Sequence, residues 1–163
     1  MDDLRTLFAG MGFAGAETFI ASGNVIFAAD DPDAAALQEQ IESELQQALG
    51  YAVATFLRTD AEVAAIARHQ PFPAPVLAAA GALNVAILAE PLSAAEAQLL
   101  MTLKTAIDDF HVHGREVYWL CQAKQSESTL SNTRFERTLR KLTTLARHQH
   151  DPQTRRQIRA IAC

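Results

Sequence analysis

The chain has 163 residues, 49% hydrophobic and 20% charged, which is the composition of an ordinary globular protein of one domain or two small subdomains. It contains no apolar run of about 18 residues, which argues against a membrane-spanning helix, and its two cysteines form neither a disulfide framework nor a metal-type spacing. The net charge of -5 hides an asymmetry, because eight Arg or Lys against two acidic residues give +6 from Arg134 onward and leave -11 for the rest. The N-terminus lacks a signal-peptide pattern, so we expect a cytoplasmic protein with no membrane partner.

The first predicted elements are a short helix and a hairpin. Apolar residues recur at helical spacing from Leu4 to Met11, after two aspartates that suit a first turn. Residues 16–29 then form two β-rich runs around Ser22-Gly23-Asn24, whose residue types favour a tight turn. We therefore predict a β-hairpin here.

A longer helix and a third strand follow the hairpin. An apolar stripe from Leu37 to Leu49 predicts a helix that Asp31-Pro32 begins and Gly50 ends. Residues 51–57 are typical of a strand. The segment Thr59-Asp60-Ala61-Glu62 is a capping box that opens another helix, and the prolines within 70–75 end it.

The second half predicts a similar series of elements. Residues 83–89 form a strand, and a second capping box begins at Ser93, with an apolar stripe of Leu99, Leu103 and Ile107. Residues 110–113 and 116–123 are expected to form a hairpin that turns at Gly114-Arg115, with Cys121 and Trp119 buried. The last helix is capped by Asn132 and buries Phe135, Leu139 and Leu142. Past Leu145 the apolar period is lost, so we expect an irregular end.

These elements predict an α+β protein of two ferredoxin-like (split β-α-β) subdomains, each lacking one strand. The expected boundaries are 1–58 for the first subdomain, 59–80 for a helix and a Pro/Ala-rich linker, 81–145 for the second subdomain, and 146–163 for an irregular basic tail. A sheet that lacks a strand exposes backbone donors and acceptors along an edge. Self-association through such edges is therefore one expected interaction, and the partners are otherwise unknown.

Five segments together match a pattern known from other proteins: Asp3–Phe8, Ile20–Phe27, Leu57–Thr59, Gly114–Tyr118 and Ser128–Asn132. With these segments the chain resembles a bacterial family known as domain of unknown function 1697 (DUF1697). The resemblance covers roughly residues 1 to 142, and the Ser-Gly-Asn-Val-Ile-Phe segment is its most specific part. It implies two related α+β subdomains and no established activity.

Two departures from the family's pattern lead to the expectation of a truncated family member. Members of that family begin with a further strand and an Arg-Gly-Ile-Asn-Val-Gly-Gly loop, and they end with an Asn-Thr-x-x-Lys-Leu segment. Residues 146–155, read one nucleotide later with suitable codon choices, can spell Arg-Ala-Ile-Asn-Thr-Ile-Arg-Lys-Leu. We therefore hypothesise a frameshift near Thr144–Ala146, which the nucleotide sequence would decide.

No catalytic constellation is recognisable, and we expect no cofactor. No phosphate-binding glycine loop occurs, and Ser22 lacks the Gly-x-Ser-x-Gly context of a nucleophile. Ligand binding has two candidate sites: a turn could bind through its amides and hydroxyl, and a helix N-terminus could contact phosphate. The residues are Ser22, Gly23, Asn24, Ser128, Ser131 and Asn132. Turn formation and helix capping explain the same residue types.

Two pairs of histidines share a spacing. His111 and His113 fall on one face of a predicted strand, and His148-x-His150 repeats the pattern. A zinc site would need a third ligand, and no Cys, Asp or Glu of the sequence is placed to supply it. We therefore expect no metal site.

The first interpretation of the sequence is a binding or regulatory module of unknown activity. A nucleic-acid-binding protein is one alternative, which would use Arg134, Arg137, Arg140 and Lys141 at helical spacing on the last helix. The acidic body and the lack of an aromatic RNA-binding run argue against it. An enzyme with a site between the subdomains is the other alternative.

Overall fold

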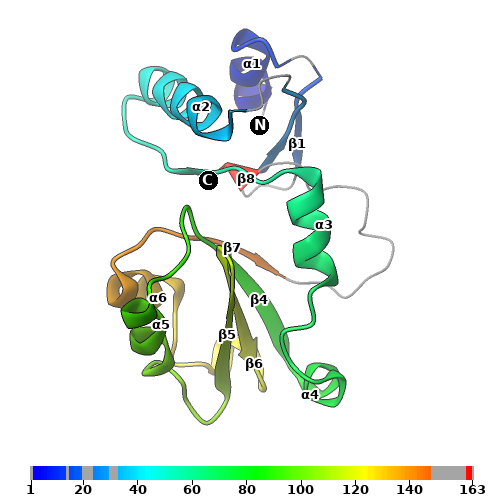
Figure 1. Ribbon diagram of the computed structural model, residues 1–163. Coiled ribbons are helices and arrows are strands. Elements are labelled where there is room, and N and C mark those ends of the chain that lie inside the picture. Colours follow the sequence, from blue (N-terminus) through cyan, green and yellow to red (C-terminus); the bar gives the residue numbers. More distant parts are fainter. Residues whose placement is uncertain (1, 14, 20–23, 30–32, 148–160, 163) are drawn as a thin grey trace. The chain divides into compact units, whose positions relative to one another are not determined.

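Figure 1 shows a computed structural model of the chain, which describes all residues except 1, 14, 20–23, 30–32, 148–160 and 163. The chain divides into two compact units, Met1–Ala65 with Gln153–Cys163, and Ile66–Pro152. We call them the first unit and the second unit and describe each by itself. Each unit combines helices with a four-stranded sheet, which confirms the predicted α+β class.

The first unit contains a sheet in the order β1-β2-β8-β3, in which all neighbours are antiparallel. Its elements are α1 (Asp2–Gly10), β1 (Glu17–Phe19), β2 (Asn24–Ile26), α2 (Ala34–Leu49), β3 (Thr55–Phe56) and β8 (Ile161–Ala162). The short first helix and the pairing of β1 with β2 are as predicted. The end of the chain was predicted to be irregular, but it contains strand β8, which lies between β2 and β3 (red in Figure 1). Two residues carry too little pattern to predict a strand.

Helix α2 begins and ends at residues with capping geometry. The Asp33 carboxylate accepts hydrogen bonds from the Ala35 and Ala36 amides at 3.0 and 3.1 Å, so Asp33 is the N-cap rather than the predicted Asp31. Gly50 ends the helix in the left-handed conformation at φ 79°, as predicted. The start of α2 is thus displaced by two residues from the prediction, because a further aspartate, Asp33, follows Pro32 and caps the helix instead.

The core of the first unit is built where α1 and α2 meet the sheet. Phe8 of α1, Val25 of β2 and Ile41 of α2 are fully buried, and Leu45 is nearly so. Burying such side chains stabilises a fold by about 1.5–3 kcal/mol each. The apolar stripe of α2 therefore has the packing role that its spacing predicted.

The second unit contains a sheet in the order β5-β6-β4-β7, again antiparallel throughout. Its elements are α4 (Ala74–Ala79), β4 (Ala82–Ile87), α5 (Ala94–Met101), β5 (Asp108–His113), β6 (Glu116–Cys121), the 3-10 helix η1 (Gln125–Glu127), α6 (Asn132–Leu139) and β7 (Thr144–Arg147). From β4 onward the order is β-α-β-β-α-β. The prediction that this half lacks a strand is wrong, because β7 pairs with β4 over four residues. Thr-Leu-Ala-Arg has little β pattern of its own, so this strand depends on its partner.

One face of this sheet carries the core of the second unit. Phe110 of β5 and Trp119 of β6 pack with Leu100 of α5 and Phe135 of α6. Figure 1 shows α5 and α6 together on one side of the sheet. Of the predicted stripe, Leu103 is buried in this core, whereas Leu99 is 43% exposed and its neighbour Leu100 is fully buried instead. The helix ends at Met101, so Leu103 and Ile107 follow α5 and are not part of it.

The segment before β4 is more regular than its prolines suggested. Helix α3 (Asp60–Arg68) follows the predicted capping box of Thr59 and Glu62, and Pro73 is the N-cap of the short helix α4. Gly81 then leads into β4. A Cβ atom at Gly81 would lie 2.0 Å from the Ala123 carbonyl oxygen, so the backbone here approaches too closely for any side chain.

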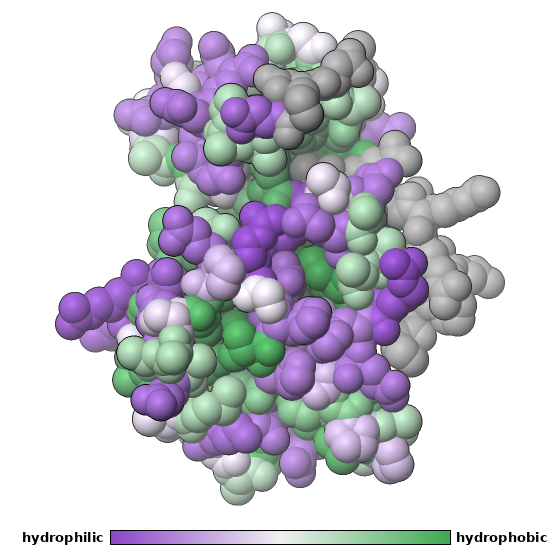
Figure 2. Space-filling model, in the orientation of Figure 1, coloured by the Kyte–Doolittle hydropathy of each residue, from purple (hydrophilic) through white to green (hydrophobic). Residues whose placement is uncertain are grey.

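Figure 2 shows polar and apolar residues interspersed over the face in view. Within the described part of the chain, the large hydrophobic residues that are exposed come from both units: Leu49, Tyr51, Val76, Leu99, Met101 and Leu142. Among the described residues, the helices are all too short or too polar to cross a bilayer.

Candidate metal centre

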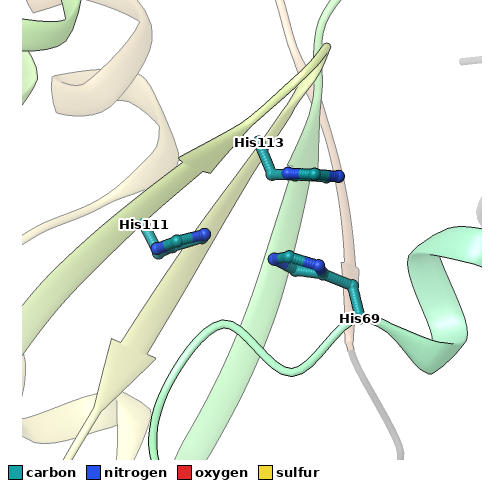
Figure 3. Close-up of side chains that lie close together, drawn as sticks. All are labelled: His69, His111 and His113. Carbon is teal, nitrogen blue, oxygen red and sulfur yellow. The ribbon is translucent and has the colours of Figure 1, made fainter.

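Three histidines gather on the second unit. His69 follows the last residue of α3, and His111 and His113 lie on β5. One ligand nitrogen from each ring lies within 4.8 Å of the other two. His69 and His111 are half-buried, and His113 is exposed. Figure 3 shows the three rings gathered in front of the strands, with a nitrogen of His111 turned toward the His69 ring.

The alternation of β5 separates its histidines from the core. Phe110 and Val112 pack against the core on one face of the sheet, so His111 and His113 project from the other. Their cross-strand partners in β6 are Tyr118 and Glu116. The hairpin therefore places two imidazoles, a phenol and a carboxylate on one face, as the i, i+2 spacing predicted for the two histidines.

A shared carbonyl places His69 over this face. The Ile66 carbonyl oxygen accepts hydrogen bonds from the His69 backbone amide and from the Tyr118 hydroxyl, each at 3.3 Å. These bonds join the end of α3 to β6. The Nε2 atom of His69 is buried, and its ring contacts that of Tyr118 with centroids 4.9 Å apart. Burial, and after it the charge of Glu116, raises the pKa of Tyr118 above its usual range, so its hydroxyl stays protonated.

The rings of the cluster lie in contact. His69 stacks on His113 with centroids 4.1 Å apart and an interplanar angle of 16°, and it lies 5.2 Å from the His111 centroid. A metal ion lies in the plane of each imidazole that binds it, so stacked rings cannot both bind without a rotation. Two ~2.1 Å Zn–N bonds at a tetrahedral angle place the nitrogens about 3.4 Å apart. The nitrogens, which now lie within 4.8 Å of one another, would therefore approach by up to about 1.4 Å around an ion.

The predicted turn residues lie only partly within the described residues. Ser22 and Gly23 fall outside them. Asn24 begins β2 and pairs with Phe19 and Ile161. A ligand at this turn stays a prediction.

The polar residues before α6 hold the second unit together. The Ser128 hydroxyl lies 3.0 and 2.9 Å from the two oxygens of the buried Asp108 carboxylate. Ser131, not the predicted Asn132, is the N-cap of α6 and accepts from the Arg134 amide at 3.2 Å. The Asn132 side chain accepts a hydrogen bond from the Thr143 hydroxyl. Phosphate binding by these residues stays a prediction beside these internal roles.

The four basic residues do not share one helix. Arg134 and Arg137 lie on α6, which ends at Leu139. Arg140 is the C-cap in a left-handed conformation at φ 52°, and this turn breaks the predicted helical spacing. Lys141 then pairs with Glu96 at 3.3 Å. Their use in nucleic-acid binding stays a prediction.

A family model described as "Protein of unknown function (DUF1697)" matches residues 1–118. The chain belongs to the DUF1697 family. The DUF1697 match spans all three histidines of the cluster, and its description gives no activity. No curated protein and no solved structure matches the chain.

His69 is a member of the cluster that the sequence pattern did not predict. It lies 42 positions before His111, beside a proline-containing break, and neither its spacing nor its neighbours distinguish it. The i, i+2 spacing of His111 and His113 was the visible signal. The third imidazole reaches the other two because the end of α3 lies against β6 in the folded chain.

Proposed function

We propose that this DUF1697 protein is a cytoplasmic binding module whose ligand is a divalent transition-metal ion, with Zn²⁺ the best fit. The observation that carries the proposal is the convergence of the three imidazoles of His69, His111 and His113 within 4.8 Å. The expectation of no metal site depended on the lack of a third ligand, and His69 can be that ligand.

The donor set favours a borderline transition metal. Neutral imidazole suits zinc, copper, iron and nickel, whereas calcium and magnesium prefer oxygen ligands. Three protein ligands leave one position of a tetrahedral zinc ion for water or another small ligand. His113 is exposed, which supports entry of the ion from solvent.

The three ligands come from two segments that are far apart in the sequence, a strand and a loop. His111 and His113 lie on a paired strand, and His69 lies on a loop held by a shared carbonyl. A bound ion would join the loop to the strand, and its binding free energy would then stabilise the second unit.

The direct test is metal titration of the purified protein by calorimetry with Zn²⁺ and by absorption with Co²⁺, whose tetrahedral complexes are coloured. We expect one ion per chain. Single substitutions His69→Ala, His111→Ala and His113→Ala should each weaken binding by more than the ~10–100-fold that loss of an outer partner costs.

The chain offers a matched control for nonspecific binding by histidine. The double variant His148→Ala/His150→Ala removes the same i, i+2 spacing outside the described residues, and we expect it to keep the wild-type affinity. A wild-type protein that binds no Zn²⁺, or whose binding depends on His148 and His150 instead of the cluster, contradicts the proposal.

A further inference from the structure

We infer that Glu116 is a positioning residue of this metal centre: its carboxylate orients the His113 imidazole and offsets the charge of the bound ion. The inference rests on the proposed function, because it assigns a partner to one ligand of the same site. Glu116 itself is not needed as a direct ligand.

Strand register brings Glu116 to His113. The two residues are directly opposite each other in the β5–β6 hairpin. His111 and Tyr118 form the same kind of pair two residues further from the turn. Directly opposite Cβ atoms of an antiparallel pair lie about 5 Å apart and their side chains project from the same face. A glutamate side chain spans that distance easily.

The position of the carboxylate is confined to this end of the hairpin. Glu116 is only 8% exposed, although it is the first residue after the turn. Its Oε2 atom lies 3.4 Å from the point where a Cβ of Gly114 would stand. Gly114 adopts φ 59°, and the absence of a side chain there leaves room for the carboxylate to fold back over the turn.

Glu116 shares this face of the sheet with the other rings of the cluster. Tyr118 lies two residues further along β6, and its ring contacts those of His69 and His111. The carboxylate, the phenol and the three imidazoles thus form one continuous group on this face of the sheet. A metal-bound imidazole carries positive charge and an N–H, so it can both attract a carboxylate in this group and donate a hydrogen bond to it.

Other carboxylates of the same strand are less suited to this role. Asp109 lies on the same face of β5 as His111, but its carboxylate pairs with Lys104. Asp108 lies on the other face, where it accepts a hydrogen bond from Trp119. Metal-binding histidines usually donate their second N–H to a carboxylate, a carbonyl or water, and this partner fixes the ring and strengthens the ligand. Glu116 is placed for that role toward His113.

The test compares Glu116→Gln with Glu127→Gln. Both variants remove one negative charge from the second unit, but Glu127 is exposed and lies beyond the far end of β6. We expect Glu116→Gln to weaken Zn²⁺ binding by about 10–100-fold and Glu127→Gln to leave it within twofold. Glu116→Asp keeps the charge on a shorter chain and should fall between wild type and Glu116→Gln, which guards against a simple folding defect.

A spectroscopic measurement separates positioning from general stability. In the Zn²⁺-loaded wild-type protein, nitrogen NMR should show His113 with one metal-bound nitrogen and one hydrogen-bonded N–H, and Glu116→Gln should alter only the latter. If the wild-type protein binds Zn²⁺ and Glu116→Gln binds it equally well with an unchanged His113 signal, the role of Glu116 is overturned and the proposed function stands. If the wild-type protein binds no Zn²⁺, the proposed function fails, and this inference fails with it.

Discussion

In both units, a glutamate on the preceding helix holds the threonine at the start of an edge strand. In the first unit, Glu42 of α2 accepts hydrogen bonds from the Thr55 amide and hydroxyl at 2.8 and 3.0 Å. In the second unit, Glu136 of α6 accepts from the Thr143 amide and hydroxyl at 2.8 and 3.1 Å. A glutamate on the helix that precedes the strand thus fixes the start of β3 in one unit and of β7 in the other.

The two units differ in the strand that pairs with this edge strand, which is β8 beside β3 and β4 beside β7. In the second unit, β4 pairs with six residues of β6 and four of β7. In the first unit, the described residues of β8 pair with one residue of β2 and two of β3. The same edge strand can therefore pair with a six-residue strand, as in the second unit, or with a two-residue strand from a distant segment, as in the first. We therefore expect the second unit to be the more stable, and four experiments test this.

The largest expected effect is a lower free energy of unfolding of the second unit in the variant Asp108→Ala. The buried Asp108 carboxylate accepts hydrogen bonds from Trp119, Ser128 and Thr105. Its removal leaves these donors unpaired in the interior, which costs about 3–5 kcal/mol. Chemical unfolding followed by the fluorescence of Trp119, the one tryptophan of the sequence, should show the loss. Asp109→Ala is the control, and equal stability of the two variants would contradict the prediction.

Zinc binding should increase the difference in stability between the two units. At a free Zn²⁺ concentration of 100 times the dissociation constant, binding stabilises the folded second unit by about 2.7 kcal/mol. Hydrogen exchange should slow at residues 66–72 and along the β5–β6 hairpin, with no change in β1 and β2. Equal slowing in both units would show that the effect is not specific to the histidine cluster.

The paired substitutions Thr55→Val and Thr143→Val sharpen the comparison further. Each removes a hydroxyl hydrogen bond to a glutamate and keeps the β-branched shape and the backbone bond, so each should cost about 1 kcal/mol. Residue-resolved hydrogen exchange should assign each loss to the unit that carries the substitution. A loss that appears in both units would show that they unfold together.

The smallest expected effect concerns acid. Hydrogen bonds from the Ser93 amide and hydroxyl, and more weakly Lys141, lower the pKa of Glu96 below its usual 4.5. A lowered pKa in the folded state means that this stabilisation is fully present above pH 4.5 and is lost as pH falls through the folded value. Thermal unfolding between pH 7 and pH 3 should therefore show a smaller acid loss in Glu96→Gln. An identical acid loss in the two proteins would rule out this contribution.

The sequence predicted most of the elements that depend on local patterns. Both capping boxes, the Gly50 helix end and the β5–β6 hairpin follow from residue types at fixed spacing, and the structure has them. It did not predict β7 or β8, because short strands gain their structure from partners far away in the chain. The same limit applies to caps where two candidates adjoin, as with Ser131 and Asn132.

The candidate site divides in the same way. The spacing of His111 and His113 placed them correctly on one face of a strand, since alternation is a local property. Neither His69 nor Glu116 could be assigned to that face from the sequence. One depends on where the end of α3 lies against β6, and the other on the pairing register across the hairpin.

The close approach of Gly81 to the Ala123 carbonyl gives a simple marker for any library of random variants of this protein. Every replacement at position 81 adds a carbon atom where another chain segment already stands, whatever the chemistry of the new side chain. Selection for folded protein should therefore return glycine alone at this codon. A library that retains alanine or serine there has not been selected for the native pairing of β4 and β6.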